Sequence, residues 1–307
     1  FVILAGAAAM RFVLMPGYFS RIAERANIVP ADFAGKAAEL IVLLCVAAAL
    51  FALGLWDDIK HLSPGLKLIV QFVAALTAAF IGEIRVEFFI ESKLATSVLS
   101  AFWIVLIINA FNFLDNMDGL SAGIAVIASS ILFTAAAMSG QIFVGGLAVA
   151  FIGALCGFLV FNFPPAKIFM GDAGSMVVGF FVAMLTLRTT YYHEALSGKW
   201  YPVFMPLIVM AVPLYDFISV TLLRISQGRS PFVGDTQHFS HRLRKRGLSD
   251  RQTTLTLYLA TLCTGLGAIF LYQVDLAGAI LIFLQTIMVL SIIAILETTS
   301  DNAKKAE

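Results

Sequence analysis

The chain has 307 residues, of which 60% are hydrophobic and only 13% are charged. An average soluble domain is about 45–50% apolar and about 25% charged, so this composition excludes an ordinary water-soluble fold. The formal net charge of +1 provides no overall field that would favour binding to nucleic acid. The three cysteines all lie inside apolar runs, which argues against disulfides and against a zinc site.

Apolar runs of near-spanning length recur along the whole sequence. A helix that crosses roughly 30 Å of hydrocarbon needs about 20 mostly apolar residues, and by this measure we expect about ten membrane-spanning helices. They lie near 1–15, 38–56, 66–82, 98–114, 119–138, 142–161, 174–190, 203–223, 253–272 and 276–296. The stretches between them are too short for a soluble domain, so we expect one all-α, polytopic membrane domain over 1–307. Phe1 opens directly into an apolar run, which predicts that the sequence starts inside a longer chain.

Basic residues are concentrated in the longest predicted loop, 224–252. They are Arg224, Arg229, Arg242, Arg244, Lys245, Arg246 and Arg251. Loops rich in lysine and arginine stay on the cytoplasmic side of a membrane. Counting spans outward from this loop places 57–65, 115–118 and 162–173 at the same face. Four clusters of polar residues lie in these loops, all at the same face of the membrane. Polar residues with only a structural role would be expected at both faces.

The first cluster is the adjacent pair Asp57 and Asp58, at the end of a predicted span. Two neighbouring carboxylates repel each other unless they share a cation or a proton. The pair is therefore interpreted either as a solvated helix end or as a cation site or base. Lys67 follows at the start of the next span, where it could meet a phosphate or anchor the helix at the interface.

The second cluster ends the next predicted span. Asn109, Asn112 and Asp115 are three residues apart and share one face of a helix, and Asp118 follows three residues later. Polar amides near bilayer depth are costly and usually functional. The alternative is a helix end with its turn at Asp118 and Gly119, but this does not account for the two asparagines inside the span.

The third cluster runs from Asn162 to Ser175. Two prolines interrupt the preceding helix, and a glycine-rich turn opens the next one. Such a turn offers N–H groups to an anion, and Asp172 at the positive end of a helix is stabilised in the form that can hold Mg²⁺. The alternative is a plain loop with an acid at a helix start.

The fourth cluster is His238, His241 and Arg242 inside the basic loop. Two histidines three residues apart could bind a metal, a phosphate or a proton, but no cysteine or His-Glu-x-x-His pattern supports zinc. The neighbouring arginines favour an anion over a merely solvated face. Acids that hold Mg²⁺ beside basic groups that bind phosphate are typical of phosphate chemistry. The apolar remainder of the chain indicates that one substrate is a lipid.

These motifs resemble those of the polyprenyl-phosphate N-acetylhexosamine-1-phosphate transferases. The resemblance rests on Asp57-Asp58, on Asn109-Ala-Phe-Asn112-Phe-Leu-Asp115-Asn116-Met-Asp118-Gly119-Leu120, and on Pro164-Pro165-Ala166-Lys167-Ile168-Phe169-Met170-Gly171-Asp172-Ala173-Gly174-Ser175. It implies a Mg²⁺-dependent enzyme of the bacterial inner membrane, with its active-site cleft facing the cytoplasm. The enzyme would move N-acetylhexosamine 1-phosphate from a UDP-sugar to polyprenyl phosphate and release UMP. The sequence departs from the family at Ser240, where the loop usually has a further histidine, and at Thr236, where arginine is common.

The resemblance also implies roles for individual residues. Asn112 and Asp172 would hold Mg²⁺, and Asp57 and Asp58 would face the lipid phosphate and the metal. Asp115, Asn162 and Phe169 would line the uridine nucleotide, and the two histidines would contact phosphate. The candidate catalytic set is Asp57, Asp58, Asp115, Asp118, His238 and His241, and the candidate substrate-binding set is Lys67, Asn109, Asn162, Phe169 and Arg242.

Several alternatives stay open on sequence alone. UDP-N-acetylglucosamine is the preferred donor, because the second and fourth clusters look most like the GlcNAc branch of the family, and UDP-MurNAc-pentapeptide is second. A transporter would place its polar sites near the midplane, often in inverted repeats, whereas here the acids lie at span ends and no repeat is seen. A purely structural membrane scaffold does not account for the four clusters. Oligomeric state is left open, with a homodimer among the alternatives.

Overall fold

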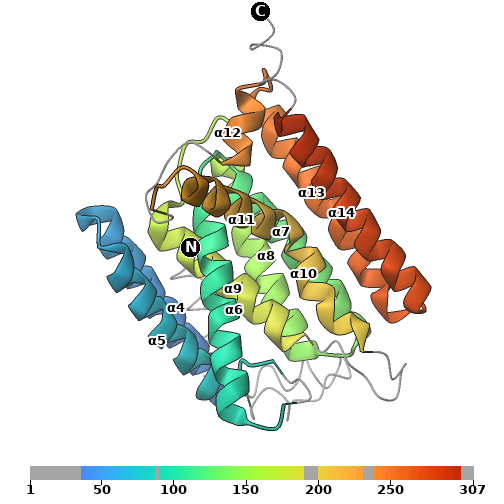
Figure 1. Ribbon diagram of the computed structural model, residues 1–307. Helices are drawn as coiled ribbons and strands as arrows, with labels where there is room; N and C mark the ends of the chain where they lie inside the picture. The colour runs from blue at the N-terminus through green and yellow to red at the C-terminus, as the bar shows by residue number, and fades with distance from the viewer. Residues whose placement is uncertain (1–35, 87–89, 190–199, 231–237, 299–307) are drawn as a thin grey trace, which may run out of the picture.

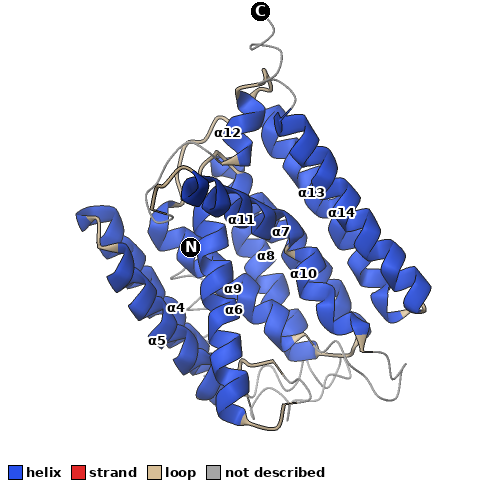
Figure 2. Ribbon diagram, in the orientation of Figure 1, coloured by secondary structure: helices blue, strands red, loops and turns tan. Residues whose placement is uncertain are grey.

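The computed structural model describes residues 36–86, 90–189, 200–230 and 238–298. Within these ranges all regular structure is helical and no strand occurs (Figure 2). The long helices are α4 (Ala37–Lys60), α5 (Pro64–Phe80), α6 (Lys93–Leu114), α7 (Leu120–Met138), α8 (Ile142–Asn162), α9 (Gly171–Arg188), α11 (Ala211–Ser226), α13 (Asp250–Ile269) and α14 (Leu276–Thr298). The short segments are η1 (Tyr201–Phe204), α10 (Met205–Val209), α12 (Phe239–Arg244) and η2 (Phe270–Tyr272).

Seven helices in the described part of the chain are long and apolar enough to cross a membrane, and the α10–α11 pair would add an eighth if it is one span. These helices fall where the apolar runs predicted them, so the expectation of an all-α, polytopic membrane protein is confirmed. The predicted span 1–15 lies outside the described residues.

Two predicted spans differ from expectation. The run 66–82 forms the 17-residue helix α5, whose length of about 26 Å falls short of a hydrocarbon core of roughly 30 Å. The run 203–223 is broken, because α10 and α11 meet at a bend of 65°. Pro213 explains the break: it has no N–H to donate to the carbonyl of Val209, and its ring would clash with that carbonyl in a continuous helix.

Helix α9 lies at the centre of the bundle and packs along both α4 and α6, while α7 packs along α8 and α13 (Figure 1). The α4–α9 contact depends on Gly54, because a Cβ added there would lie 2.5 Å from the backbone of Ala173. This close approach brings the last turn of α4 beside the first turn of α9. The acidic pair at the end of one helix therefore adjoins the acid at the start of the other.

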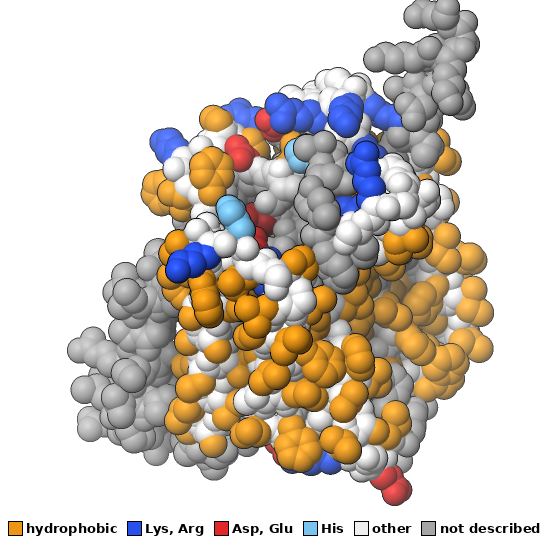
Figure 3. Space-filling view, turned by 60° about the vertical axis from the view of Figure 1, so that its left-hand side comes forward, with side chains coloured by type: hydrophobic (Ala, Val, Ile, Leu, Met, Phe, Trp, Pro, Cys, Tyr) orange, Lys and Arg blue, Asp and Glu red, His pale blue; other side chains and the backbone are white. Residues whose placement is uncertain are grey.

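The surface of the molecule is divided into zones. Figure 3 shows a broad belt of hydrophobic side chains, with lysine and arginine gathered at the end where α12 lies. Many large apolar side chains are exposed, among them Ile69, Val160, Leu281 and Ile295. An exposed apolar belt below a basic rim is the arrangement expected of a protein embedded in a bilayer.

Candidate active site

The start of α9 is capped by a side chain from α4. Asp58 accepts hydrogen bonds from the backbone N–H groups of Asp172 at 2.9 Å and Ala173 at 3.2 Å. These are two of the N–H groups that a helix leaves unpaired at its start. Gly171 precedes them with φ of 63°, and a Cβ added there would lie 2.9 Å from an Asp58 oxygen. Asp58 therefore holds the glycine-rich turn against the end of α4.

Lys67 from α5 lies between two carboxylates. Its ammonium nitrogen is 2.6 Å from Asp57 Oδ2 and 2.5 Å from Asp172 Oδ2. The second oxygen of Asp57 accepts a hydrogen bond from Leu62 N at 2.7 Å. All three charged groups are largely shielded from solvent, with side-chain exposures of 12–29%. Shielding strengthens the attraction between these charges and leaves their geometry fixed.

The asparagines of α6 extend the same cluster. Asn112 Nδ2 donates to Asp172 Oδ1 at 2.8 Å and to Ser175 Oγ at 3.0 Å. One turn deeper, Asn109 Nδ2 donates to Oε1 of Gln71 at 2.8 Å. The predicted shared face of Asn109 and Asn112 is confirmed, and it points toward α5 and α9. Because amide oxygen and nitrogen are assigned from such networks, either end of Asn112 can face this site.

Asp115 lies at the end of α6 in a strongly acidic environment. Burial raises the pKa of its carboxyl to about 8, and the negative charges of Asp172, Asp58 and Asp118 add to the effect. A hydrogen bond from the backbone of Gly171 acts in the opposite direction. The acids of this cluster thus carry more negative charge than Lys67 alone offsets, which favours a bound cation.

The loop between α8 and α9 is anchored by two predicted site residues. Asn162 is buried, accepts a hydrogen bond from Gly119 N at 3.1 Å and donates one to Ile168 O at 2.9 Å. Asp118 accepts a hydrogen bond from Ala166 N at 2.9 Å. These contacts shape a loop whose Phe169 side chain is 78% exposed. The loop therefore presents an aromatic face toward solvent at the site.

Helix α12 joins the fourth cluster to the second. Ser240 donates a hydrogen bond to Asn116 Oδ1 at 2.6 Å. Ring contacts also place His238 against Phe113, with centroids 5.3 Å apart, and His241 with its centroid 6.4 Å from that of His238. All four clusters predicted from the sequence are thus brought together at one end of the bundle.

The two histidines differ in their surroundings. His238 is buried, and its Nδ1 lies 2.9 Å from Asp216 Oδ2. Partial burial lowers the pKa of His241, and electrostatic interactions with His238, Arg244 and Lys245 lower it further. His241 is therefore neutral at pH 7, and it has one N–H to donate.

Two residues at this end of the bundle were not predicted as site residues from the sequence. Asp216 is fully buried in α11 and bonded to His238, and Ser219, one turn later, accepts a hydrogen bond from Arg242 Nη2 at 3.0 Å. An ionisable residue inside an apolar run was the available signal for Asp216, because such residues are rare and usually functional. Nothing in the spacing of residues pointed to Ser219.

The chemistry of the donor groups fits Mg²⁺. Among the described residues, no group of three or more His, Cys, Asp or Glu side chains is arranged to hold a metal ion. Mg²⁺ needs only one or two protein carboxylates, because it keeps several of its own waters and prefers oxygen ligands. Asp57 and Asp172 already share one cation, the Lys67 ammonium, and Asn112 and Ser175 offer further oxygens beside Asp172.

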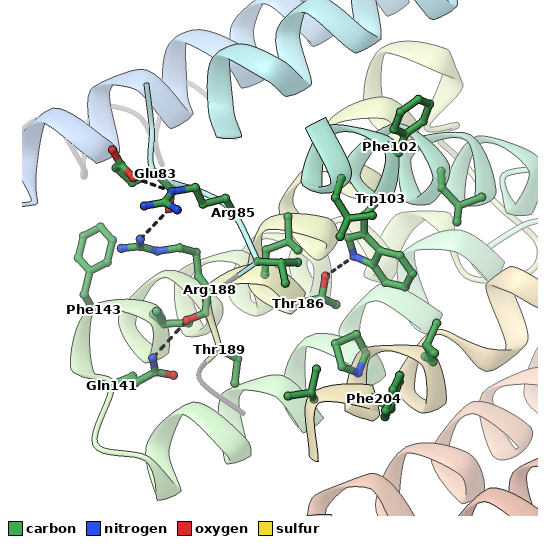
Figure 4. A pocket seen from close by; sticks show the side chains of 18 of the residues that line it. Glu83, Arg85, Phe102, Trp103, Gln141, Phe143, Thr186, Arg188, Thr189 and Phe204 are labelled. Atoms are coloured by element: carbon green, nitrogen blue, oxygen red, sulfur yellow. Dashed lines mark hydrogen bonds and ion pairs between the residues drawn. The ribbon is translucent and has the colours of Figure 1, made fainter. Parts of the chain in front are cut away.

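A separate cavity of about 970 Å³ lies at the opposite end of the bundle, where α6 and α8 begin and α9 ends (Figure 4). Figure 4 shows Arg85 hydrogen-bonded to Glu83 on its rim and Trp103 bonded to Thr186 deeper in. None of the predicted site residues lines it. The candidate active site is therefore the polar end of the bundle and not this cavity.

The sequence is similar to those of known proteins. The family model described as glycosyl transferase family 4 matches residues 40–190. The chain is 32% identical over 256 residues to a probable undecaprenyl-phosphate N-acetylglucosaminyl 1-phosphate transferase of Bacillus subtilis, covering 81% of this chain and 70% of that protein. It is 30% identical over 273 residues to a decaprenyl-phosphate N-acetylglucosaminephosphotransferase of Mycobacterium tuberculosis, covering 78% and 66%.

A third relative is the undecaprenyl-phosphate alpha-N-acetylglucosaminyl 1-phosphate transferase of Escherichia coli K12, which is 28% identical over 231 residues. That alignment covers 71% of this chain and 61% of the relative. The chain thus spans about two thirds of the length of the curated relatives it matches. The motifs, the helical architecture and these matches agree, and the chain belongs to the glycosyl transferase family 4 group of polyprenyl-phosphate N-acetylhexosamine-1-phosphate transferases.

Proposed function

We propose that this chain transfers N-acetylglucosamine 1-phosphate from UDP-N-acetylglucosamine to a polyprenyl phosphate. One observation carries the proposal: Asp57, Lys67, Asn112 and Asp172 meet at the polar end of an apolar helical bundle. That place suits the meeting of a lipid phosphate with a water-soluble nucleotide sugar. The names of the relatives, an undecaprenyl-phosphate and a decaprenyl-phosphate transferase, supply the acceptor class.

In the reaction, an oxygen of the polyprenyl phosphate attacks the β-phosphorus of the UDP-sugar. The bond from that phosphorus to the oxygen bridging it to the α-phosphorus breaks, and UMP leaves with the bridging oxygen. The product is a polyprenyl diphosphate bearing the sugar. A carboxylate of the Asp57–Asp58 pair would accept any proton that remains on the attacking phosphate.

The chain's basic groups would hold the phosphates. Lys67 would bind the lipid phosphate; its ammonium lies beside Asp57, near the end of α4 and the start of α5. His241 and Arg242 would donate hydrogen bonds to the diphosphate of the donor, Arg242 as a planar fork. The neutral His241 would donate one such bond.

The uridine would stack on Phe169, whose exposed ring stands at the rim of the site. Asn162 and Asp118 would act by shaping the loop that carries this ring, since both use their polar atoms within it. Asp115 would lie near the same nucleotide. Its raised pKa favours the protonated carboxyl, which can donate a hydrogen bond.

Asp172 and Asn112 would hold Mg²⁺, with Asp57 facing them. When bound, Mg²⁺ would offset the charge of the diphosphate and of the departing UMP. The basic loop that contains α12 would lie on the cytoplasmic side of a bacterial inner membrane, where nucleotide sugars are made available.

Purified protein mixed with Mg²⁺, UDP-N-acetylglucosamine and undecaprenyl phosphate tests the proposal. UMP and a lipid-linked sugar diphosphate should appear together, and neither should form when the lipid is omitted. Replacing the donor with UDP-MurNAc-pentapeptide should give no product. If only UDP-MurNAc-pentapeptide gives product, the chain belongs to the other branch of the family. If neither donor releases UMP, the proposed transferase activity is rejected.

A further inference from the structure

Asp216 is the most deeply buried acid in the described part of the chain. Its side chain is fully buried in α11, a helix of mainly apolar residues. Both carboxylate oxygens are used: Oδ2 lies 2.9 Å from His238 Nδ1, and Oδ1 accepts a hydrogen bond from Phe239 N at 3.0 Å. Burying a carboxylate is expensive unless it is bonded, so this pair of contacts explains why Asp216 is tolerated there.

The two contacts fix the orientation of His238. Phe239 is the first residue of α12, so Asp216 satisfies a free N–H at the start of that helix and holds the helix against α11. An ionised carboxylate only accepts hydrogen bonds, so the contact with His238 requires a proton on Nδ1. The ring nitrogen left to meet a ligand is then Nε2, and no hydrogen bond to it is made by the described residues.

The surroundings keep this ring in place. The rings of His238 and Phe113 meet edge to face, with ring planes at 89°. The guanidinium of the buried Arg224 lies 4.9 Å from the same Phe113 ring. Phe113 follows Asn112 directly, so the His238 ring is packed beside the helix that carries the candidate metal ligand. The charged or titratable groups that these contacts place around His238 are Asp216, Arg224 and His241.

We infer that Asp216 is a positioning residue for transfer: its two hydrogen bonds fix the place of His238 and hold the ring proton on Nδ1. Nε2, which has no proton in this tautomer, then faces the substrate phosphate and accepts a hydrogen bond from a protonated phosphate oxygen. The contact between His238 and the substrate phosphate rests on the proposed function. The hydrogen bonds of Asp216 with His238 and Phe239 do not depend on that function. The family model ends at residue 190, so it assigns nothing to Asp216.

Nitrogen NMR of ¹⁵N-histidine-labelled full-length protein tests the arrangement without any substrate. The His238 signals, assigned by their loss in His238→Gln, should show a protonated Nδ1. In Asp216→Asn, the amide oxygen can still accept the hydrogen bond from Phe239 N–H, while the amide NH₂ faces Nδ1 of His238. Because that NH₂ donates a hydrogen bond, Nδ1 must accept it, and the ring proton should move to Nε2. Wild-type protein that carries the proton only on Nε2 would overturn the inference, whether or not the variant folds.

Kinetics test whether Asp216 acts through His238. We expect Asp216→Asn and His238→Ala each to lower kcat/KM at least about tenfold, and the double variant to be within about threefold of His238→Ala. Such non-additivity would not arise from a general loss of structure. If the losses in kcat/KM of the two single variants multiply in the double variant, the positioning role is overturned.

Asp275→Asn is the matched control, because Asp275 also accepts a hydrogen bond from a free N–H at a helix start, from Gly278 N at 2.9 Å. It lies before α14, away from the candidate site, and its substitution should change neither the His238 signals nor kcat/KM. Wild-type protein that shows a protonated Nδ1 but no transfer would reject the proposed function while supporting the Asp216–His238 pairing.

Discussion

The ammonium nitrogen of Lys67 lies 2.5 Å from a carboxylate oxygen of Asp172, although 105 positions separate the two residues in the sequence. The same nitrogen contacts Asp57. The ammonium thus sits where a divalent cation would gain most from both carboxylates. We expect Mg²⁺ to compete with Lys67 for these oxygens and to free its ammonium for a phosphate.

Lys67→Met should therefore bind Mg²⁺ more tightly, because the competing positive charge is removed. The same change should lower kcat/KM for polyprenyl phosphate at least about tenfold, since the lipid phosphate loses its partner. Calorimetric titration with Mg²⁺ and steady-state kinetics measure the two effects. Lys93→Met, which breaks an exposed ion pair with Glu83, is the control and should alter neither. Weaker Mg²⁺ binding in Lys67→Met would contradict the competition.

Asp172→Asn should abolish transfer while the protein stays folded, because the change is nearly isosteric and keeps the hydrogen-bond acceptor for Lys67. Its carboxylate charge is lost at the place where Asp57, Lys67 and Asn112 converge. Initial rates of UMP release measure the effect. Turnover above about a tenth of the wild-type value, a cost below about 1.4 kcal/mol, would refute the metal role.

The fold was largely predictable, because spans need long apolar runs and these are visible in the sequence. The break between α10 and α11 was also predictable in principle, since Pro213 lies inside the run 203–223. The grouping of the four clusters followed from counting spans. The sequence alone does not predict which side chains contact each other across helices.

Asp58 shows this limit clearly. As one of two adjacent acids, it looked equivalent to Asp57, but its carboxylate caps α9 while that of Asp57 pairs with Lys67. The difference arises because successive residues of a helix point about 100° apart. Likewise, the hydrogen bonds of Asn162 to Gly119 and Ile168 depend on a loop path that no local spacing reveals.

His241 should make stability depend on pH in mildly acidic solution. Its pKa is lowered in the folded protein, chiefly by burial, so the unfolded chain binds a proton first as pH falls below about 6.5. Stability should thus be fully present above that pH and decline as pH falls through the folded pKa. Thermal unfolding in detergent should show this decline, and His241→Gln should flatten it. His61→Asn, at an exposed histidine, should leave the slope unchanged.

Phe169→Ala should raise KM for the UDP-sugar by about fivefold or more, because stacking on a base contributes about 1–3 kcal/mol. Folding should be unaffected, since the ring is 78% exposed. Phe169→Trp should retain a low KM because it keeps an aromatic face. Ile168→Ala, at the neighbouring exposed position, serves as the control. An unchanged KM in Phe169→Ala would place the uridine elsewhere.

The orientation of the bundle can be tested with two single cysteines. The native cysteines Cys45, Cys156 and Cys263 are first replaced by alanine, because two of them are exposed on the apolar surface. Lys245→Cys lies in the basic segment after α12, and Gln273→Cys lies between η2 and α14, at the other end of α13.

The positive-inside rule places residue 245 in the cytoplasm and residue 273 outside it. An impermeant thiol reagent added to intact cells should therefore label Gln273→Cys and spare Lys245→Cys, and both should react after lysis. The reverse pattern would invert the topology and separate Asp172 and Lys67 from cytoplasmic nucleotide sugars. Since the two cysteines differ only in position, unequal labelling reports orientation and not the chemistry of the thiol.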